Sequence, residues 1–423
     1  MPFPRSLAAA GLALGLALVT CAATTVPATA RTATAGLDRA LLRQSLDAIR
    51  DAGMYGVYSA VRDGRADWRG ASGVADVTTR RPVRPDMAHR VGSITKSFTA
   101  VALLQQAERG RLVLDAPIAR YLPGLVPGER GRAVTVRMLL NHTSGIGDHI
   151  LGAFPSLLQG STASLDDNRF RRIRPRELVA LGLAAPAPGE PGQRFSYSNT
   201  NYVIAGLLLE RLTGEDAEGY ITRNVIRRAG LRDTAFPRTP FIPGPHSRGY
   251  EAFYGLIDPP RDYSVYDMSW IYTAGALVST TEDLSAFYRA LLGGRLIGQR
   301  WLDEMRTTVT VPDQTGAIPL YGLGIYAVDL PCGRFWGHDG AVFGYGTISL
   351  SSPDGSRQFS VGINLMKYQQ VNADGTLEPH AIDFALNDHL YIALCGPDAA
   401  GTAARGTAPL NLFRMDGHWN GLK

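Results

Sequence analysis

The chain has 423 residues, of which 45% are hydrophobic and 9% aromatic, so it can bury a large core and is neither a disordered nor a fibrous protein. Its formal charge is +5, but the arginines are dispersed along the chain and are not clustered with aromatic residues, which argues against nucleic acid as a partner.

The N-terminal segment is typical of an export signal. Arg5 precedes an apolar run over residues 7–19, and residues 28–30 have the small-x-small form of a signal-peptidase site. The run is shorter than the about 20 apolar residues that cross a bilayer. We therefore expect residues 1–30 to be a signal peptide and the mature protein to be secreted, without stable membrane insertion. Lipid attachment at Cys21 is an alternative.

The first part of the expected mature chain predicts a helix over residues 37–52, followed by two strands over 54–61 and 66–74. Asp63-Gly64 between the two strands is a strong hairpin signal. A second helix is expected over 93–108, ending near Gly110. A sheet therefore begins early in the chain.

Residues 111–290 predict mainly helices joined by loops that contain proline and glycine, and strands return only afterwards. The expected helices are 136–140, 176–183, 202–212 and 281–292; the late strands are 322–328, 334–338, 346–351 and 359–365, and a last helix covers 377–394.

Sheet segments from both ends of the chain with helices between them predict an α+β fold. We expect an antiparallel sheet flanked by helices, and a mainly helical lobe inserted at about 111–290, with the site in the cleft between them. The catalytic domain would cover 31–396 and be followed by a flexible tail over 397–423.

Ser93-Ile94-Thr95-Lys96 is the main candidate for catalysis. Residues i and i+3 share a helix face, so the Lys96 amine can reach the Ser93 hydroxyl, and the start of a helix stabilises developing negative charge. The chain has three lysines, and the other 40 of its 43 basic residues are arginines. A lysine at position 96 therefore suggests a task that arginine cannot perform, because an amine can lose its proton and then take one from serine.

Tyr197-Ser198-Asn199 is the second candidate. In an extended loop the tyrosine and the asparagine point the same way, which suits a phenol that relays protons and an amide that holds a substrate carbonyl. Taken alone, the same residues could be a packed tyrosine and a helix-capping asparagine.

The third candidate is His338-Asp339-Gly340, at the end of a late strand. The strand edge could supply an oxyanion N–H from Ala341, while Gly340 would let a substrate backbone lie close. Taken alone, His338 would be a structural histidine.

In this order, Ser-x-x-Lys, Tyr-x-Asn and His-x-Gly resemble the three active-site signatures of the serine β-lactamase and penicillin-binding family. Residues 38–396 are similar to the secreted D-alanyl-D-alanine carboxypeptidases of its class-C-like branch. The resemblance implies an acyl-enzyme on Ser93, with Lys96 and Tyr197 sharing the general-base and general-acid work.

The same resemblance implies roles for further residues. Asn199 would hold the substrate amide, and His338 would assist the leaving group or position Tyr197. The N–H groups of Ser93 and Ala341 would form the oxyanion hole. Trp270 and Phe154 fall where the family has aromatic subsite walls, although both could equally be core residues. Cys332 and Cys395, the cysteines left after signal removal, are placed like a disulfide pair of this branch.

The sequence departs from the carboxypeptidases where they hold the substrate carboxylate. The family uses hydroxyls on the third motif and an arginine before the first cysteine, and these positions are Asp339, Ala341 and Tyr326 here. Asp339 would repel a carboxylate and could instead bind a cationic group. The acyl-transfer residues are unaffected.

We therefore expect a D-alanyl-D-alanine carboxypeptidase-like, penicillin-binding enzyme that acts on peptidoglycan stem peptides, with β-lactams as inhibitors. The alternatives are an esterase or a D-stereospecific aminopeptidase or amidase of the same fold and, as a minor one, a non-catalytic penicillin-binding or cell-wall-binding module. The absence of G-x-S-x-G, H-E-x-x-H and glycine-rich phosphate-loop motifs argues against an α/β-hydrolase, a metal and a nucleotide cofactor. His142 is expected in a structural turn of the helical lobe.

Overall fold

The fold was obtained as a computed structural model that describes residues 36–311, 320–373 and 376–398. The expected signal peptide, residues 1–30, and nearly all of the expected C-terminal tail lie outside these ranges.

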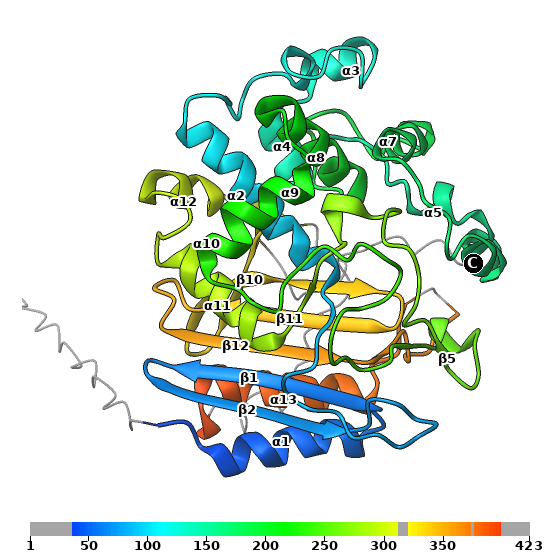
Figure 1. The fold of residues 1–423 in the computed structure, drawn as a ribbon, viewed down its shortest axis with the longest axis vertical. Coiled ribbons are helices and arrows are strands. Elements are labelled where there is room, and N and C mark those ends of the chain that lie inside the picture. The colour runs from blue at the N-terminus through cyan, green and yellow to red at the C-terminus, as the bar shows by residue number, and fades with distance from the viewer. Residues whose placement is uncertain (1–35, 312–319, 374–375, 399–423) are drawn as a thin grey trace, which may run out of the picture. The chain divides into compact units, whose positions relative to one another are not determined.

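An eight-stranded antiparallel sheet forms the centre of the fold (Figure 1), in the order β2-β1-β12-β11-β10-β9-β8-β7. β1 pairs with β12, so the early hairpin and the late strands join in one sheet. Gly64 turns the β1–β2 hairpin with a φ of 57°. The strands are β1 Gly56–Asp63, β2 Ala66–Gly73, β7 Val309–Thr310, β8 Leu320–Tyr321, β9 Tyr326–Leu330, β10 Gly333–Val342, β11 Tyr345–Ser351 and β12 Arg357–Ile363.

Helices cover both faces of the sheet, so β12 is buried on both sides. Phe359, Val361 and Ile363 belong to the same apolar cluster as the buried residues of α1 (Arg39–Asp51) and α13 (Ala381–Cys395). Ser360 points the other way and hydrogen-bonds Ser285 of α11 (Thr281–Leu292) at 2.8 Å.

The helical part of the chain lies between β2 and β7 and surrounds α2 (Thr95–Glu108) (Figure 1). Every residue of α2 except Glu108 is buried, as expected of a central helix that is apolar all round. The remaining α-helices are α3 Gly128–Ala133, α4 Val136–Leu140, α5 Ile150–Ala153, α6 Ala163–Asp167, α7 Pro175–Ala184, α8 Asn199–Thr213, α9 Ala217–Ile221, α10 Arg227–Ala229 and α12 Gln299–Met305.

Short elements complete the frame. β3 (His89–Arg90) pairs with β6 (Val278–Ser279), while β4 (Tyr250–Glu251) lies between β5 (Arg261–Asp262) and β13 (Leu365–Met366). The short helical turns are η1 Gly92–Ile94, η2 Ile118–Arg120, η3 Pro155–Gln159, η4 Thr222–Ile226, η5 Phe253–Gly255 and η6 Tyr272–Ala274. In the described part of the chain, no helix combines the length and the apolar character needed to cross a membrane.

The elements match the expected order, but several ends differ. α8 begins at Asn199 and not at residue 202, because the carboxylate of distant Asp148 accepts the Asn199 backbone N–H. β10 runs on to Val342 because β11 pairs with it along this length. α13 begins at Ala381, where His380 and Asp383 form a reciprocal cap.

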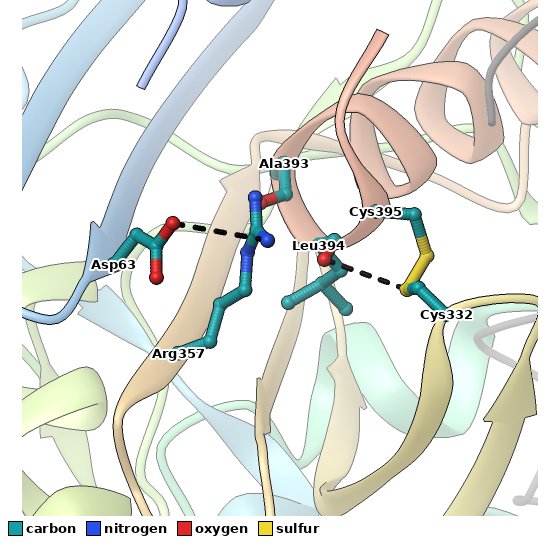
Figure 2. The surroundings of a disulfide bond; sticks show 6 residues. All are labelled: Asp63, Cys332, Arg357, Ala393, Leu394 and Cys395. Carbon is teal, nitrogen blue, oxygen red and sulfur yellow. Dashed lines mark hydrogen bonds and ion pairs between the residues drawn. A yellow bond between two sulfur atoms is a disulfide. The ribbon is translucent and has the colours of Figure 1, made fainter. Parts of the chain in front are cut away.

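A disulfide joins Cys332, in the turn between β9 and β10, to Cys395 at the end of α13 (Figure 2). The two Cα atoms are 5.3 Å apart and 63 positions apart in sequence. Beside this bond, Arg357 reaches Asp63 of β1 at 3.8 Å and the carbonyl of Ala393 at 3.3 Å. The last helix is therefore attached to the sheet through both covalent and polar contacts.

Candidate active site

Ser93 and Lys96 lie together where η1 runs into α2. Lys96 is completely buried, and its Nζ is 2.9 Å from Ser93 Oγ, 2.7 Å from Asn199 Oδ1 and 2.9 Å from the carbonyl of Ala274. The oxygens of Asn199 and Ala274 accept two N–H bonds. A neutral amine in this position would direct its lone pair to the Ser93 hydroxyl.

The backbone of η1 lies against the edge of β10. β9 pairs with β10 only as far as Gly337, so the following residues of β10 present an edge to η1. A Cβ atom on Gly340 would come within 2.0 Å of Val91 O and 3.0 Å of Ser93 N, and one on Gly92 within 2.9 Å of Ala341 N. Both glycines are therefore required for this approach, which brings the backbone of Ser93 close to that of Ala341.

Asn199 connects the lysine to a carboxylate that the sequence did not single out. Its Oδ1 accepts from Lys96, while its Nδ2 donates to Asp148 Oδ2 at 2.9 Å. Asp148 also accepts the backbone N–H of Ile150 at 2.8 Å. It remains partly exposed, and only the tertiary fold brings it to the site, since it lies 51 positions from Asn199.

Tyr197 packs over the lysine. Lys96 Nζ is 4.7 Å from the centre of the Tyr197 ring, and the tyrosine is 9% exposed. The ring of His142 lies 4.2 Å from that of Tyr197 on centroids, and Tyr321 meets Tyr197 edge-on at 6.5 Å. The structure thus brings Ser93, Lys96, Tyr197 and Asn199 together.

His338 is enclosed beside this group. Its side chain is fully buried, with Nε2 2.9 Å from the Tyr321 hydroxyl and Nδ1 2.5 Å from the carbonyl of Asp339. Burial and, after it, the positive charge that Lys96 carries when protonated lower the pKa of His338 to about 3, so the ring is neutral near pH 7. Tyr321 contacts both His338 and Tyr197 and so connects the two residues.

Asp339 and Tyr326 lie away from the pocket. Asp339 is 3% exposed, and its Oδ1 lies 3.5 Å from Nδ1 of the fully buried His338. Burial and, after it, the Asp339 carboxylate raise the pKa of Tyr326 well above its usual value. The acidic group expected to contact a cationic substrate is thus enclosed beside a tyrosine.

A pocket that is open to solvent lies over Ser93 and Asn199. Trp270 is part of its wall, whereas Phe154 is 1% exposed and packs edge-on behind Trp270 at 5.5 Å. Lys367 also contributes to the wall, and its Nζ is 3.0 Å from the buried Glu251. The remaining lining residues are Ile150, Ile271, Gly275, Ala341, Val342 and Phe343, most of them apolar.

Comparisons with known proteins match this arrangement to one family. The Beta-lactamase family model matches residues 39–383. The crystal structure of a D-stereospecific amidohydrolase from Streptomyces sp. is 34% identical, with a TM-score of 0.74, and the match covers 85% of this chain and 99% of that one.

Curated relatives with other activities also match. Esterase EstB of Burkholderia gladioli is 33% identical over 217 residues, 47% of this chain and 53% of the esterase. Penicillin-binding protein 4* of Bacillus subtilis (strain 168) is 26% identical over 306 residues, 70% of this chain and 64% of the relative.

Proposed function

The chain belongs to the beta-lactamase family and has the fold of its serine hydrolases, and from this premise we propose that it cleaves amide bonds of D-amino-acid derivatives through an acyl-enzyme on Ser93. The observation that carries the proposal is the position of the buried Lys96 amine, 2.9 Å from Ser93 Oγ and held by two other acceptors.

The first half of the reaction forms the acyl-enzyme. Ser93 Oγ attacks the substrate carbonyl carbon while its proton passes to neutral Lys96. The N–H groups of Ser93 and Ala341 donate to the carbonyl oxygen as it becomes negative. The C–N bond then breaks, and Tyr197 delivers a proton to the departing amine.

The second half returns the enzyme to its starting state. Water attacks the ester carbonyl of the acyl-enzyme and loses a proton to the Lys96 and Tyr197 pair. The bond to Ser93 Oγ breaks, and Ser93 regains its proton. The second Nδ2 hydrogen of Asn199 is available to hold the substrate amide oxygen, since the first is directed at Asp148.

Two features favour a substrate with a free ammonium group over one with a terminal carboxylate, and Lys367, the charged residue of the pocket wall, is paired with Glu251. Asp148 places a partly exposed carboxylate beside Asn199, where it can pair with an α-ammonium group. The carboxylate-binding hydroxyls and arginine of the carboxypeptidases are replaced by Asp339, Ala341 and Tyr326. A D-amino-acid amide therefore fits better than the D-alanyl-D-alanine stem peptide.

The amidohydrolase match supports this choice because it covers 85% of this chain, against 47% for the esterase match, and because that enzyme is D-stereospecific. Ester cleavage is a second candidate, supported by the esterase match and by the general ability of an acyl-transfer site to accept a better leaving group. Export of the protein, with residues 1–30 as its signal, remains part of the proposal.

The test compares D-phenylalanine amide with its L enantiomer, using wild type and Ser93→Ala. We expect wild type to cleave the D form and not the L form, with an acyl adduct on Ser93 visible by intact mass. Ser93→Ala should cleave neither. Equal cleavage of both enantiomers, or activity in Ser93→Ala, would overturn the proposal. A parallel incubation with penicillin shows whether β-lactams also acylate Ser93.

Asp148→Asn tests the ammonium site. For D-phenylalanine amide we expect KM to rise about 10-fold or more, because a charge-assisted bond is worth roughly 1.5–3 kcal/mol. For the N-acetylated amide, which has no ammonium group, KM should stay within about twofold. The same rise for both substrates would instead indicate that Asp148 acts only through Asn199.

A further inference from the structure

His142 lies just after α4 in a backbone conformation that needs support from its surroundings. Its φ is 60°, in the left-handed region that residues other than glycine seldom occupy, and its side chain is fully buried. Such a conformation is strained and persists only where tertiary contacts stabilise it. The contacts that stabilise it converge on one segment of the active site.

Both the main chain and the side chain of His142 hold the residues on either side of Tyr197. The carbonyl of His142 accepts the backbone N–H of Ser196 at 2.8 Å. The Nδ1 atom of its ring accepts the backbone N–H of Ser198 at 3.2 Å. The extended segment 196–198 is therefore fixed on both sides of Tyr197 by a single residue.

The ring of His142 also supports the tyrosine directly. The two ring centroids are 4.2 Å apart and the planes are inclined by 33°. Tyr321 and Tyr202 approach the His142 ring at 5.0 Å and 5.4 Å, so the imidazole is held within an aromatic layer. Lys96 Nζ lies against the same Tyr197 ring at 4.7 Å.

The hydrogen-bond partners of Nδ1 also determine which ring nitrogen of His142 carries the proton. Nδ1 receives the Ser198 N–H and faces the Asn201 amide nitrogen at 3.3 Å. An Nδ1 atom that accepts a hydrogen bond carries no proton, so the ring proton is on Nε2. Arginine or lysine could not accept in this way, and an aliphatic side chain would leave the Ser198 N–H without its acceptor.

We propose that His142 is a positioning residue for Tyr197, which sets the place of the phenol relative to Ser93 and Lys96 without touching the substrate. The inference rests on the proposed function of Tyr197 as a proton donor. Because a displacement of about 1 Å can cost about 100-fold in rate, loss of this support should affect the chemical step more than substrate binding.

Two variants separate the roles of the ring and of the acceptor. His142→Phe keeps a flat ring beside Tyr197 but removes the acceptor for Ser198. His142→Asn keeps an acceptor and tolerates a positive φ, but removes the ring. We expect kcat for D-phenylalanine amide to fall about 10- to 100-fold in His142→Phe and by less in His142→Asn, with KM within about threefold in both.

His389→Asn is the matched control. His389 is also fully buried and hydrogen-bonded, to Ser45 at 2.7 Å and Ser59 at 2.9 Å, but it belongs to α13 and faces α1 and β1, away from the pocket. The His389→Asn variant should have a lower thermal midpoint than wild type. Its kcat per folded molecule should equal that of wild type. If the His142 variants behave like His389→Asn, the positioning role is wrong and His142 is structural only.

A second readout keeps this test separate from the proposed substrate. The rate at which a fluorophosphonate labels Ser93 reports activation of the nucleophile without any D-amide. If wild type labels but does not cleave D-phenylalanine amide, the proposed function fails, and slower labelling of His142→Phe than of His389→Asn still supports positioning. Equal labelling rates in the two variants would refute it.

Discussion

Lysine at position 96 shows how the identity of a single residue determines the chemistry. The chain carries 40 arginines, yet of the two lysines within the described residues Lys367 lines the pocket and Lys96 is bonded to its lining residues Ser93 and Asn199. A guanidinium is protonated at every accessible pH, whereas a buried amine can exchange a proton with a neighbouring hydroxyl. The acceptors around Lys96 are arranged for an amine and leave Ser93 at its remaining position.

Lys96→Arg should therefore keep a positive charge at this position but lose hydrolytic activity. We expect kcat to fall by about 10³-fold or more, in the range typical of removing a general base, while the protein still folds. Steady-state cleavage of D-phenylalanine amide measures kcat, and the Ser93→Ala variant gives the background rate. Retention of more than about a tenth of wild-type kcat would mean that Lys96 acts through its charge alone.

The contact between β10 and η1 is the decisive feature at the level of elements. The strand edge beyond Gly337 approaches the start of α2 so closely that the Cβ positions of Gly92 and Gly340 are occupied by backbone atoms. This approach brings together the two backbone segments whose N–H groups are proposed for the oxyanion hole. The family resemblance implied the two donors, but the close approach of their backbones depends on the packing of β10 against η1.

Gly340→Ala should separate β10 from η1, because its methyl group would lie 2.0 Å from Val91 O. We expect kcat to fall about 100-fold and the free energy of unfolding to fall by about 1–3 kcal/mol. Gly219→Ala in α9 is the control, since its nearest neighbours are the ends of the Asp216 and Arg223 side chains. An active Gly340→Ala variant would show that the two backbones can separate without loss of the site.

At the scale of the whole molecule, the two ends of the described chain stabilise one sheet. β1 pairs with β12, α1 packs with α13 on the same face, and the Cys332–Cys395 bond attaches α13 to the turn that leads into β10. The strand that carries His338 and Gly340 is therefore secured from the C-terminal side. The disulfide therefore links the stability of the sheet to the attachment of α13.

Removal of the disulfide tests that link. A Cys332→Ser/Cys395→Ser variant should lose about 4 kcal/mol of unfolding free energy, the value expected for a closed loop of 63 residues. Urea unfolding with and without reductant measures the change. Below the unfolding transition we expect kcat near that of wild type, because the bond lies outside the pocket. Wild-type protein that unfolds at the same urea concentration in both conditions would contradict the prediction.

Acid should destabilise the fold through its buried histidines. Burial lowers the pKa of His89, His338 and His389 to about 3, below the value of about 6.5 in an unfolded chain. The unfolded state therefore binds more protons between these values. The stabilisation is complete above about pH 6.5 and is lost as the pH falls toward 3, by up to about 1.4 kcal/mol per pH unit for each histidine.

The measurement is the free energy of unfolding in urea between pH 7.5 and 5. We expect it to fall steeply below about pH 6.5, and His389→Asn should show a shallower slope than wild type because one buried titrating group is absent. An unfolding free energy that is constant over this range would show that these imidazoles are already accessible to protons in the folded protein.

The sequence by itself determined the order of the elements, the fold class and the family. Hydrophobic periodicity and turn residues are local properties, so helices such as α4 and α11 appeared with the expected bounds, and the three short motifs together led to the family. Element ends were less predictable where a distant group sets them, as Asp148 does at the start of α8.

Only the tertiary structure decided what surrounds the motifs. Whether a polar side chain faces a pocket or the core depends on contacts between residues far apart in the chain, which periodicity does not encode. Asp339 was thus expected at the substrate and is enclosed, Phe154 lies behind Trp270, and Asp148 and His142 gain their places beside Asn199 and Tyr197. The physical reason is that burial and hydrogen-bond partners depend on packing between distant parts of the chain. The identity of a reactive residue, in contrast, can be read directly from the sequence.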